Sequence, residues 1–122
     1  MGSPLTIVKA ALQAYVDKDR PRMESLIADN YHFSSPLDNC IDRKTYFDRC
    51  WPNSEKMAAV EFINGAENGD TAWVIYEARH GGKRFRNVEM HRVKDGKLIE
   101  TEVYFGWDLP HKATKGGFVN NV

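Results

Sequence analysis

The hydrophobic period of the chain changes once, at Met57, and this change limits the folds that its 122 residues can form. Before Met57, apolar side chains recur every three or four residues, as at Leu5, Val8 and Leu12, which predicts helices with one buried face. After Met57, apolar and polar residues alternate, which predicts strands. Helices followed by consecutive strands are typical of an α+β fold with the helices on one face of an antiparallel sheet.

Three helices are expected before the sheet. Ser3 before Pro4 begins the first, because serine caps helices and proline suits their first turn. A short second helix follows, and then a strand over residues 31–35. Asp42 caps the third helix, which is expected to end before Pro52.

Four consecutive strands are expected after the helices, and the short turns between them predict an antiparallel meander. Turn signals lie at residues 64–70, at Gly81-Gly82 and at residues 94–96. The strands are predicted over residues 57–64, 71–80, 84–93 and 97–107. We expect one domain over residues 1–108 and a flexible tail over residues 109–122.

The register of the last hairpin decides which side chains share a face. A two-residue Asp95-Gly96 turn would place Glu89 opposite Glu102, and facing like charges are unfavourable. A three-residue turn is therefore preferred, which places Glu89 opposite Thr101. The same register places Asn87 opposite Val103 and Phe85 opposite Phe105. Together with the Gly81-Gly82 turn, it predicts one inner face of the sheet. The residues of this face are Val60, Phe62, Ala72, Val74, Tyr76, Ala78, Phe85, Asn87, Glu89, His91, Ile99, Thr101, Val103 and Phe105.

The opposite face of the sheet carries a second apolar group, here called the outer patch. It consists of Trp73, Ile75, Val88 and Met90, with charged residues of both signs around it. An exposed apolar patch with a charged rim commonly marks a protein interface. We therefore expect a homodimer through this face.

The charge balance excludes several classes of partner. The chain has 17 basic and 17 acidic residues, so a nucleic-acid or membrane-surface partner is not expected.

The apolar runs of the chain are too short for a membrane helix, and no secretory leader is recognisable. Cys40 and Cys50 lack metal-ligand spacing. We expect a cytoplasmic protein with no metal and no cofactor.

Several segments, in their order and spacing, resemble the nuclear transport factor two-like superfamily and within it the SnoaL-like branch. They are residues 11–15, 18–19, 26–30, 35–38, 95–99 and 103–105. This superfamily, related to ketosteroid isomerases and polyketide cyclase-like proteins, implies a cystatin-like cone in which helices and a curved sheet enclose a pocket. The resemblance also implies a dimer through the outer face of the sheet.

The functional positions of related enzymes match this chain only in part. The catalytic carboxylate of ketosteroid isomerases falls on Ser35 and their helix tyrosine on Ala11, whereas their protonated carboxyl falls on Glu89. The aspartate of the epoxide hydrolases falls on Val103. The resemblance therefore does not imply either of those two mechanisms.

Glu89 and His91 are the candidate catalytic pair. Residues two apart on a strand lie about 6.6 Å apart and point the same way, so a carboxylate and an imidazole could exchange protons with one ligand. The alternative is a polar wall satisfied by neighbouring groups. The candidate ligand-binding residues are Tyr15, Phe33, Ser35, Phe62, Tyr76, Asn87, Thr101 and Phe105.

The expected function is that of a SnoaL-like pocket protein for a small apolar or aromatic molecule. Cofactor-free acid–base catalysis of the isomerase, cyclase or dehydratase type is the leading hypothesis. The alternative is a non-catalytic domain of the same fold that binds a ligand or another protein. Two further polar residues are interpreted as structural, Asp38 as part of a turn and Cys50 as a buried inert thiol.

Overall fold

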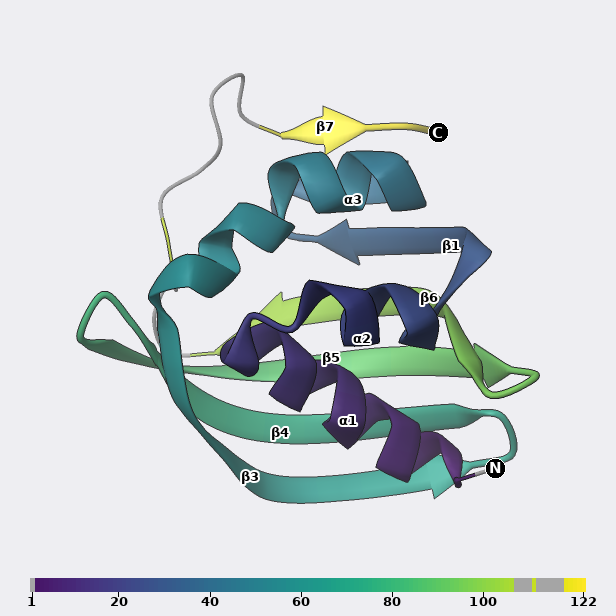
Figure 1. Cartoon of the computed structure of the whole chain (residues 1–122), viewed down its shortest axis with the longest axis horizontal. Coiled ribbons are helices and arrows are strands. Elements are labelled where there is room, and N and C mark those ends of the chain that lie inside the picture. Colours follow the sequence, from purple (N-terminus) through teal and green to yellow (C-terminus); the bar gives the residue numbers. More distant parts are fainter. Residues whose placement is uncertain (1, 107–110, 112–117) are drawn as a thin grey trace.

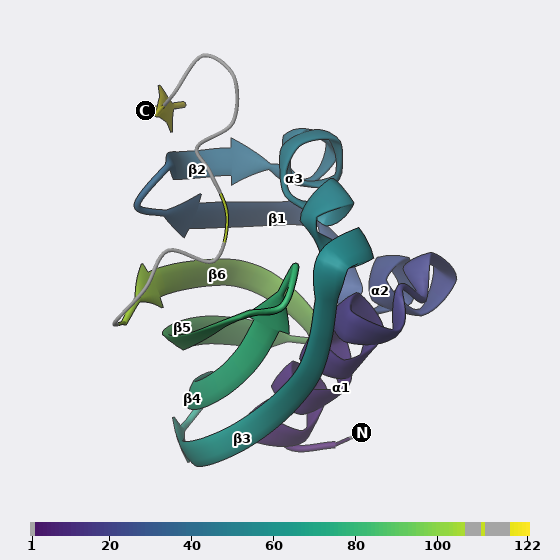
Figure 2. The same cartoon turned by 90° about the vertical axis from the view of Figure 1, so that its left-hand side faces the viewer.

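The helices of this chain lie on one face of a curved sheet (Figures 1 and 2). The computed structural model describes residues 2–106, 111 and 118–122. Its elements are α1 (Pro4–Asp17), α2 (Arg20–Leu26), β1 (Ile27–Ser35), β2 (Asp38–Asp42), α3 (Arg43–Arg49), the 3₁₀ helix η1 (Trp51–Lys56), β3 (Met57–Asn68), β4 (Thr71–His80), β5 (Lys83–Lys94), β6 (Lys97–Phe105) and β7 (Val119–Asn120). The predicted α+β class, with N-terminal helices packed on a curved sheet, is confirmed.

The described part of the chain forms a seven-stranded sheet in the order β3-β4-β5-β6-β1-β2-β7. Strands β3 to β6 are the predicted antiparallel meander. Strand β1 then joins β6 in parallel, and β2 pairs with β1. The parallel pairing was not predicted, because such partners lie far apart in the chain and no turn marks them. Strand β1 also begins earlier than the predicted strand at residues 31–35. Its first residue is Ile27, which lies opposite Leu98.

The helix boundaries follow from local capping. The Ser3 side chain accepts a hydrogen bond from the Thr6 amide, and that of Asp42 accepts one from the Thr45 amide, so both predicted N-caps are confirmed. Helix α3 ends at Arg49, before Pro52 as predicted, and Pro52 lies in the first turn of η1. No helix in the described ranges is both long and apolar enough to cross a membrane.

Strand β3 is longer and more bent than predicted. It continues to Asn68, beyond the expected end at residue 64, and interruptions of register beside residues 59–60 and 63 bend it around α1 (Figure 2). Ala59 has a φ of 58°, which matches a bulge at this point. Val60 and Phe62 are half-buried and pack against the edge of the core.

The last hairpin has the two-residue turn that the charge argument disfavoured. Lys94 pairs with Lys97, so Asp95 and Gly96 alone form the turn. Their φ angles of 53° and 77° are the left-handed values that a type I′ turn needs, and such turns match the twist of the adjoining strands. The predicted three-residue turn was therefore wrong.

A bulge at Ile99 then shifts the register by one residue. Leu98 lies opposite Val93, but Glu100 lies opposite Arg92, and Ile99 has no partner between them. Leu98 is consequently 1% exposed, whereas Ile99, the predicted inner residue, is only half-buried. The bulge avoids the like-charge pairing that the tight turn alone would have produced.

The register beyond the bulge differs from the predicted one by two residues. Glu89 lies opposite Val103, and His91 takes the place opposite Thr101. Phe105 faces Asn87 and not Phe85. Because the period of a strand is two, a shift of two leaves every predicted side chain of this segment on its face.

The end of the chain returns to the sheet. Val119–Asn120 form β7 in parallel with β2, and the Asn39 amide donates a hydrogen bond to Asn120 at 2.8 Å. This pairing falls inside the tail predicted over residues 109–122. The rest of that tail before Phe118, apart from His111, lies outside the described residues.

The outer patch lies on the convex face, away from the helices. Trp73 pairs with Met90 and Ile75 with Val88, so the four side chains form one cluster across β4 and β5. Tyr104 of β6 lies opposite Val88 and is 56% exposed, which extends the patch beyond its predicted members.

Glu77 anchors the charged rim of that face. Hydrogen bonds from Arg86 and Arg84 hold the pKa of the Glu77 carboxyl below its ordinary value of 4.5. Because the folded state favours the ionised form, this stabilisation is present above pH 4.5 and is lost as the pH falls through the lower folded value.

We therefore expect the Tm of the native protein to fall more steeply on acidification below pH 4.5 than the Tm of Glu77→Gln. Differential scanning calorimetry from about pH 7 to about pH 3 measures both slopes. Equal slopes would show that the two arginines do not stabilise the fold through this carboxylate.

Candidate functional site

Five hydrogen-bonded side chains cross the inner face of β4, β5 and β6 in one line. Asn87 donates to the Tyr76 hydroxyl at 3.1 Å, and Tyr76 donates to Oε2 of Glu89 at 2.6 Å. The other carboxylate oxygen, Oε1, lies 2.9 Å from Nε2 of His91, whose Nδ1 lies 2.8 Å from the Thr101 hydroxyl. All five are at most 7% exposed, so this relay is shielded from bulk water.

The register of three strands places these groups together. Asn87, Glu89 and His91 alternate along β5 and therefore share a face. Tyr76 of β4 lies opposite Asn87, and Thr101 of β6 lies opposite His91. The bulge in β6 is what sets Thr101 beside the imidazole, because the predicted register would have set it beside Glu89.

The proton positions in the relay follow from what each group can donate. An ionised carboxylate only accepts, so the Tyr76 hydroxyl proton and the Nε2 proton of His91 both point at Glu89. Nδ1 of His91 and the Thr101 hydroxyl share the next hydrogen bond, whose direction depends on the tautomer of the imidazole. Burial, and next the negative charge of Glu89, raise the pKa of Tyr76, which keeps its phenol a donor.

A cavity of about 90 Å³ lies between this relay and the helices. That is space for several water molecules or a small organic group. Both candidate catalytic residues line it, as do seven of the eight candidate ligand-binding residues: Tyr15, Phe33, Ser35, Tyr76, Asn87, Thr101 and Phe105. The exception is Phe62, which the bent β3 holds at the edge of the core, where Lys9 lies 5.5 Å from its ring.

Tyr31 and Tyr46 line the same cavity and were missed as site residues. Burial is the main cause that raises the pKa of Tyr15, Tyr31 and Tyr46, so all three are neutral phenols. Tyr31 shares a hydrogen bond with Thr101, and Tyr15 donates to the Cys50 carbonyl at 2.7 Å. The alternation with Phe33 was a signal for Tyr31, whereas the inward direction of Tyr46 depends on how α3 packs.

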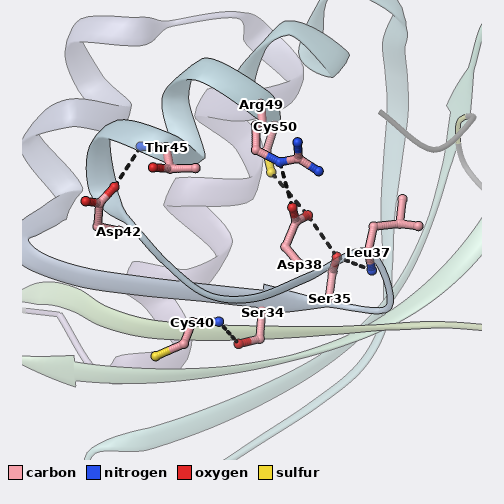
Figure 3. A network of polar contacts seen from close by, with 9 residues as sticks. All are labelled: Ser34, Ser35, Leu37, Asp38, Cys40, Asp42, Thr45, Arg49 and Cys50. Atoms are coloured by element: carbon pink, nitrogen blue, oxygen red, sulfur yellow. Dashed lines mark hydrogen bonds and ion pairs between the residues drawn. The ribbon is translucent and has the colours of Figure 1, made fainter. Parts of the chain in front are cut away.

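A second polar cluster, centred on Asp38, lines the cavity between the turn after β1 and the end of α3 (Figure 3). Asp38 is 5% exposed, and its Oδ1 accepts a hydrogen bond from Nε of Arg49 at 2.8 Å. Its Oδ2 accepts from the Ser35 hydroxyl at 3.2 Å, and the Ser35 oxygen accepts from the Leu37 amide at 3.0 Å. Asp38 is therefore the first residue of β2, directly after the turn at residues 36–37, and it also belongs to the cavity wall, whereas the prediction placed it in the turn. Arg49 was missed.

Cys50 lies beside the same carboxylate, with its sulfur 3.9 Å from Oδ2 of Asp38 (Figure 3). Burial, and then the charge of Asp38, raise the pKa of the thiol far above its ordinary value. A protonated thiol is a poor nucleophile, which agrees with the interpretation of Cys50 as inert. Within the described ranges, no three His, Cys, Asp or Glu side chains converge as a metal site would require.

The family model for SnoaL-like domains matches residues 8–101, from within α1 to within β6. The chain belongs to the SnoaL-like domain family. The resemblance predicted from the sequence is therefore confirmed, and the relay lies within the matched region. No curated protein matches the sequence.

Solved structures share the fold of this SnoaL-like domain at low sequence identity. IdmH from Streptomyces antibioticus, whose proposed activity is that of a polyketide cyclase, has a TM-score of 0.74 and 18% identity over 85% of this chain and 92% of its own. An NTF2-like protein from Cytophaga hutchinsonii has a TM-score of 0.69 and 18% identity, with 87% and 92% covered. An LEH-like epoxide hydrolase from M. tuberculosis has a TM-score of 0.70 and 17% identity, with 84% and 82% covered. These likenesses establish the nuclear transport factor two-like fold.

Proposed function

We propose that this SnoaL-like domain binds a small, largely apolar molecule in its cavity and moves a proton to or from it through Glu89 and His91. The observation that carries the proposal is the 2.9 Å contact between the carboxylate and the imidazole on the cavity wall. A buried acid–base pair beside a ligand is the arrangement that general acid–base catalysis requires. The reaction class is isomerisation, cyclisation or dehydration without a cofactor.

The relay supports this chemistry because it holds the carboxylate that exchanges the proton. Glu89 can take a proton from one atom of the ligand and return that proton to another atom, so the carboxylate is ionised again at the end of the reaction. His91 contacts Oε1 at 2.9 Å, and its hydrogen bond stabilises the ionised form of Glu89 before and after the transfer. Tyr76 holds the other carboxylate oxygen at 2.6 Å and so fixes the orientation of Glu89. Apolar walls, among them Phe33, exclude water from the reacting atoms.

A non-catalytic binding domain is the second candidate. It is favoured by one observation, namely that both oxygens of Glu89 already have a hydrogen-bond partner. Such a wall would hold the shape of the cavity and recognise a ligand without transferring a proton.

The experiment that separates the two candidates uses the molecule that co-purifies with the native protein. Mass spectrometry of the extracted molecule before and after incubation of the complex in D₂O reports exchange at carbon. Acid–base catalysis predicts deuterium uptake faster than in the free molecule. Retention of the molecule without faster uptake would support simple binding and contradict the catalytic proposal.

We also propose that a second copy of the chain covers the outer patch. The rim carries both signs, with Arg92 lying 3.3 Å from Glu100, so two copies related by a two-fold axis can face unlike charges toward each other. Trp73, the largest side chain of the outer patch, is 39% exposed.

Trp73→Glu is expected to convert a dimer to a monomer, because it removes the largest apolar contact and buries two like charges. Size-exclusion chromatography with light scattering gives the mass. Lys94→Glu, an exposed change at the hairpin end, is the control and should leave the dimer intact. A native protein that is already monomeric at micromolar concentration would contradict the proposal.

A further inference from the structure

We infer that the molecule bound in the cavity carries a hydroxyl or N–H group that donates a hydrogen bond to Oδ1 of Asn87. The inference rests on the binding part of the proposed function and adds to it the chemical class of the ligand. It starts from the Asn87 amide, which lines the cavity and is 4% exposed.

One end of this amide is paired and the other is not. Nδ2 donates to the Tyr76 hydroxyl at 3.1 Å. Oδ1 is fully buried, and no described residue donates to it. A buried acceptor without a donor destabilises a folded protein, so its presence in a cavity wall points to a partner that arrives with the ligand.

The relay fixes which end of the amide is left unpaired. An ionised Glu89 carboxylate only accepts hydrogen bonds, so the Tyr76 hydroxyl donates its one proton to the carboxylate. The phenol oxygen can then only accept, and only the NH₂ end of Asn87 can supply it. Turning the amide around would place two acceptors against each other. The unpaired end of the Asn87 amide is therefore an acceptor, and its complement is a donor.

The position of Asn87 along β5 also sets the size of the ligand. Asn87 and Glu89 are two residues apart on one face, a separation of about 6.6 Å along the strand. A ligand that reaches both must place its donor roughly one ring width from the atom that exchanges a proton. The cavity wall also includes the apolar side chains of Phe85, Val103 and Phe105. Together these features describe a hydroxylated or N–H-bearing ring compound.

The test compares phenol with anisole, which has the same ring but no donor. Fluorescence titration gives the Kd of each for the native protein, for Asn87→Leu and for Asn68→Leu. Asn68 is exposed at the end of β3, so it controls for the same chemical change outside the cavity. We expect the native preference for phenol to fall at least about fivefold in Asn87→Leu and to stay unchanged in Asn68→Leu.

An unchanged preference in Asn87→Leu would overturn the inference alone. Binding of neither compound to the native protein would overturn the proposed apolar binding site as well. A crystal structure of the native protein with phenol gives a test that does not depend on the variant folding. A phenol oxygen within hydrogen-bond distance of Oδ1 supports the inference, and a water at Oδ1 with the phenol hydroxyl elsewhere overturns it.

Discussion

Glu89→Gln is expected to slow deuterium uptake into the bound molecule by about 10²–10⁴-fold while the molecule stays bound. The amide keeps the size of the carboxylate, and its oxygen can still accept the hydrogen bond from Tyr76. It has no basic oxygen to take a proton, so the chemical step is lost whereas the shape of the cavity is kept. The measurement is mass spectrometry of the co-purified molecule after timed incubation in D₂O.

Glu100→Gln is the matched control for this variant. Glu100 lies on the outer face beside Arg92, so the same chemical change there should leave exchange unaltered. Full exchange in Glu89→Gln would remove Glu89 from the catalytic step. Loss of the molecule itself, with the fold intact by circular dichroism, would assign Glu89 to binding.

Leu98→Ala is expected to lower the free energy of unfolding by about 2–5 kcal/mol, because it empties a fully buried site opposite Ile27. Ile99→Ala is its neighbour and matched comparison. Ile99 is half-buried at the bulge, so we expect Ile99→Ala to lower the free energy of unfolding by no more than about 1 kcal/mol. Equilibrium denaturation in urea, with equal m-values, measures both.

The comparison of these two variants is a direct test of the bulge. The register predicted from charge alone places Ile99 inside, and it would make Ile99→Ala the more destabilising change. A larger effect at Ile99 than at Leu98 would therefore contradict the bulge and the pairing of Thr101 with His91 that depends on it.

Much of the site could be predicted because it depends only on the alternation of side chains between the two faces of a strand. The alternation along β5 puts Asn87, Glu89 and His91 on one face whether the register is shifted by none or by two residues. The same alternation places Tyr76 on that face through the tight Gly81-Gly82 turn, which pairs His80 with Lys83. The candidate proton-transfer pair therefore follows from the amino-acid sequence alone.

The rest of the cavity could not be predicted because it is formed by contacts that no local signal marks. Arg49 approaches Asp38 from the end of α3, and Tyr46 enters from the same helix. Both depend on where α3 packs, and that position follows from the docking of β1 on β6. Phe62 was predicted to bind the ligand but does not line the cavity, because the bend of β3 places it at the edge of the core.

The sequence by itself determined the helices, the meander, the family and the face of each predicted inner residue on β4 and β5. These features depend on period, capping and turn chemistry, which act over a few residues. Only the tertiary structure decided the partner of each inner side chain, the parallel edge of the sheet and the line from Asn87 to Thr101. These depend on one bulge and on contacts between distant segments, whose free energy is gained only when the whole sheet closes on its helices.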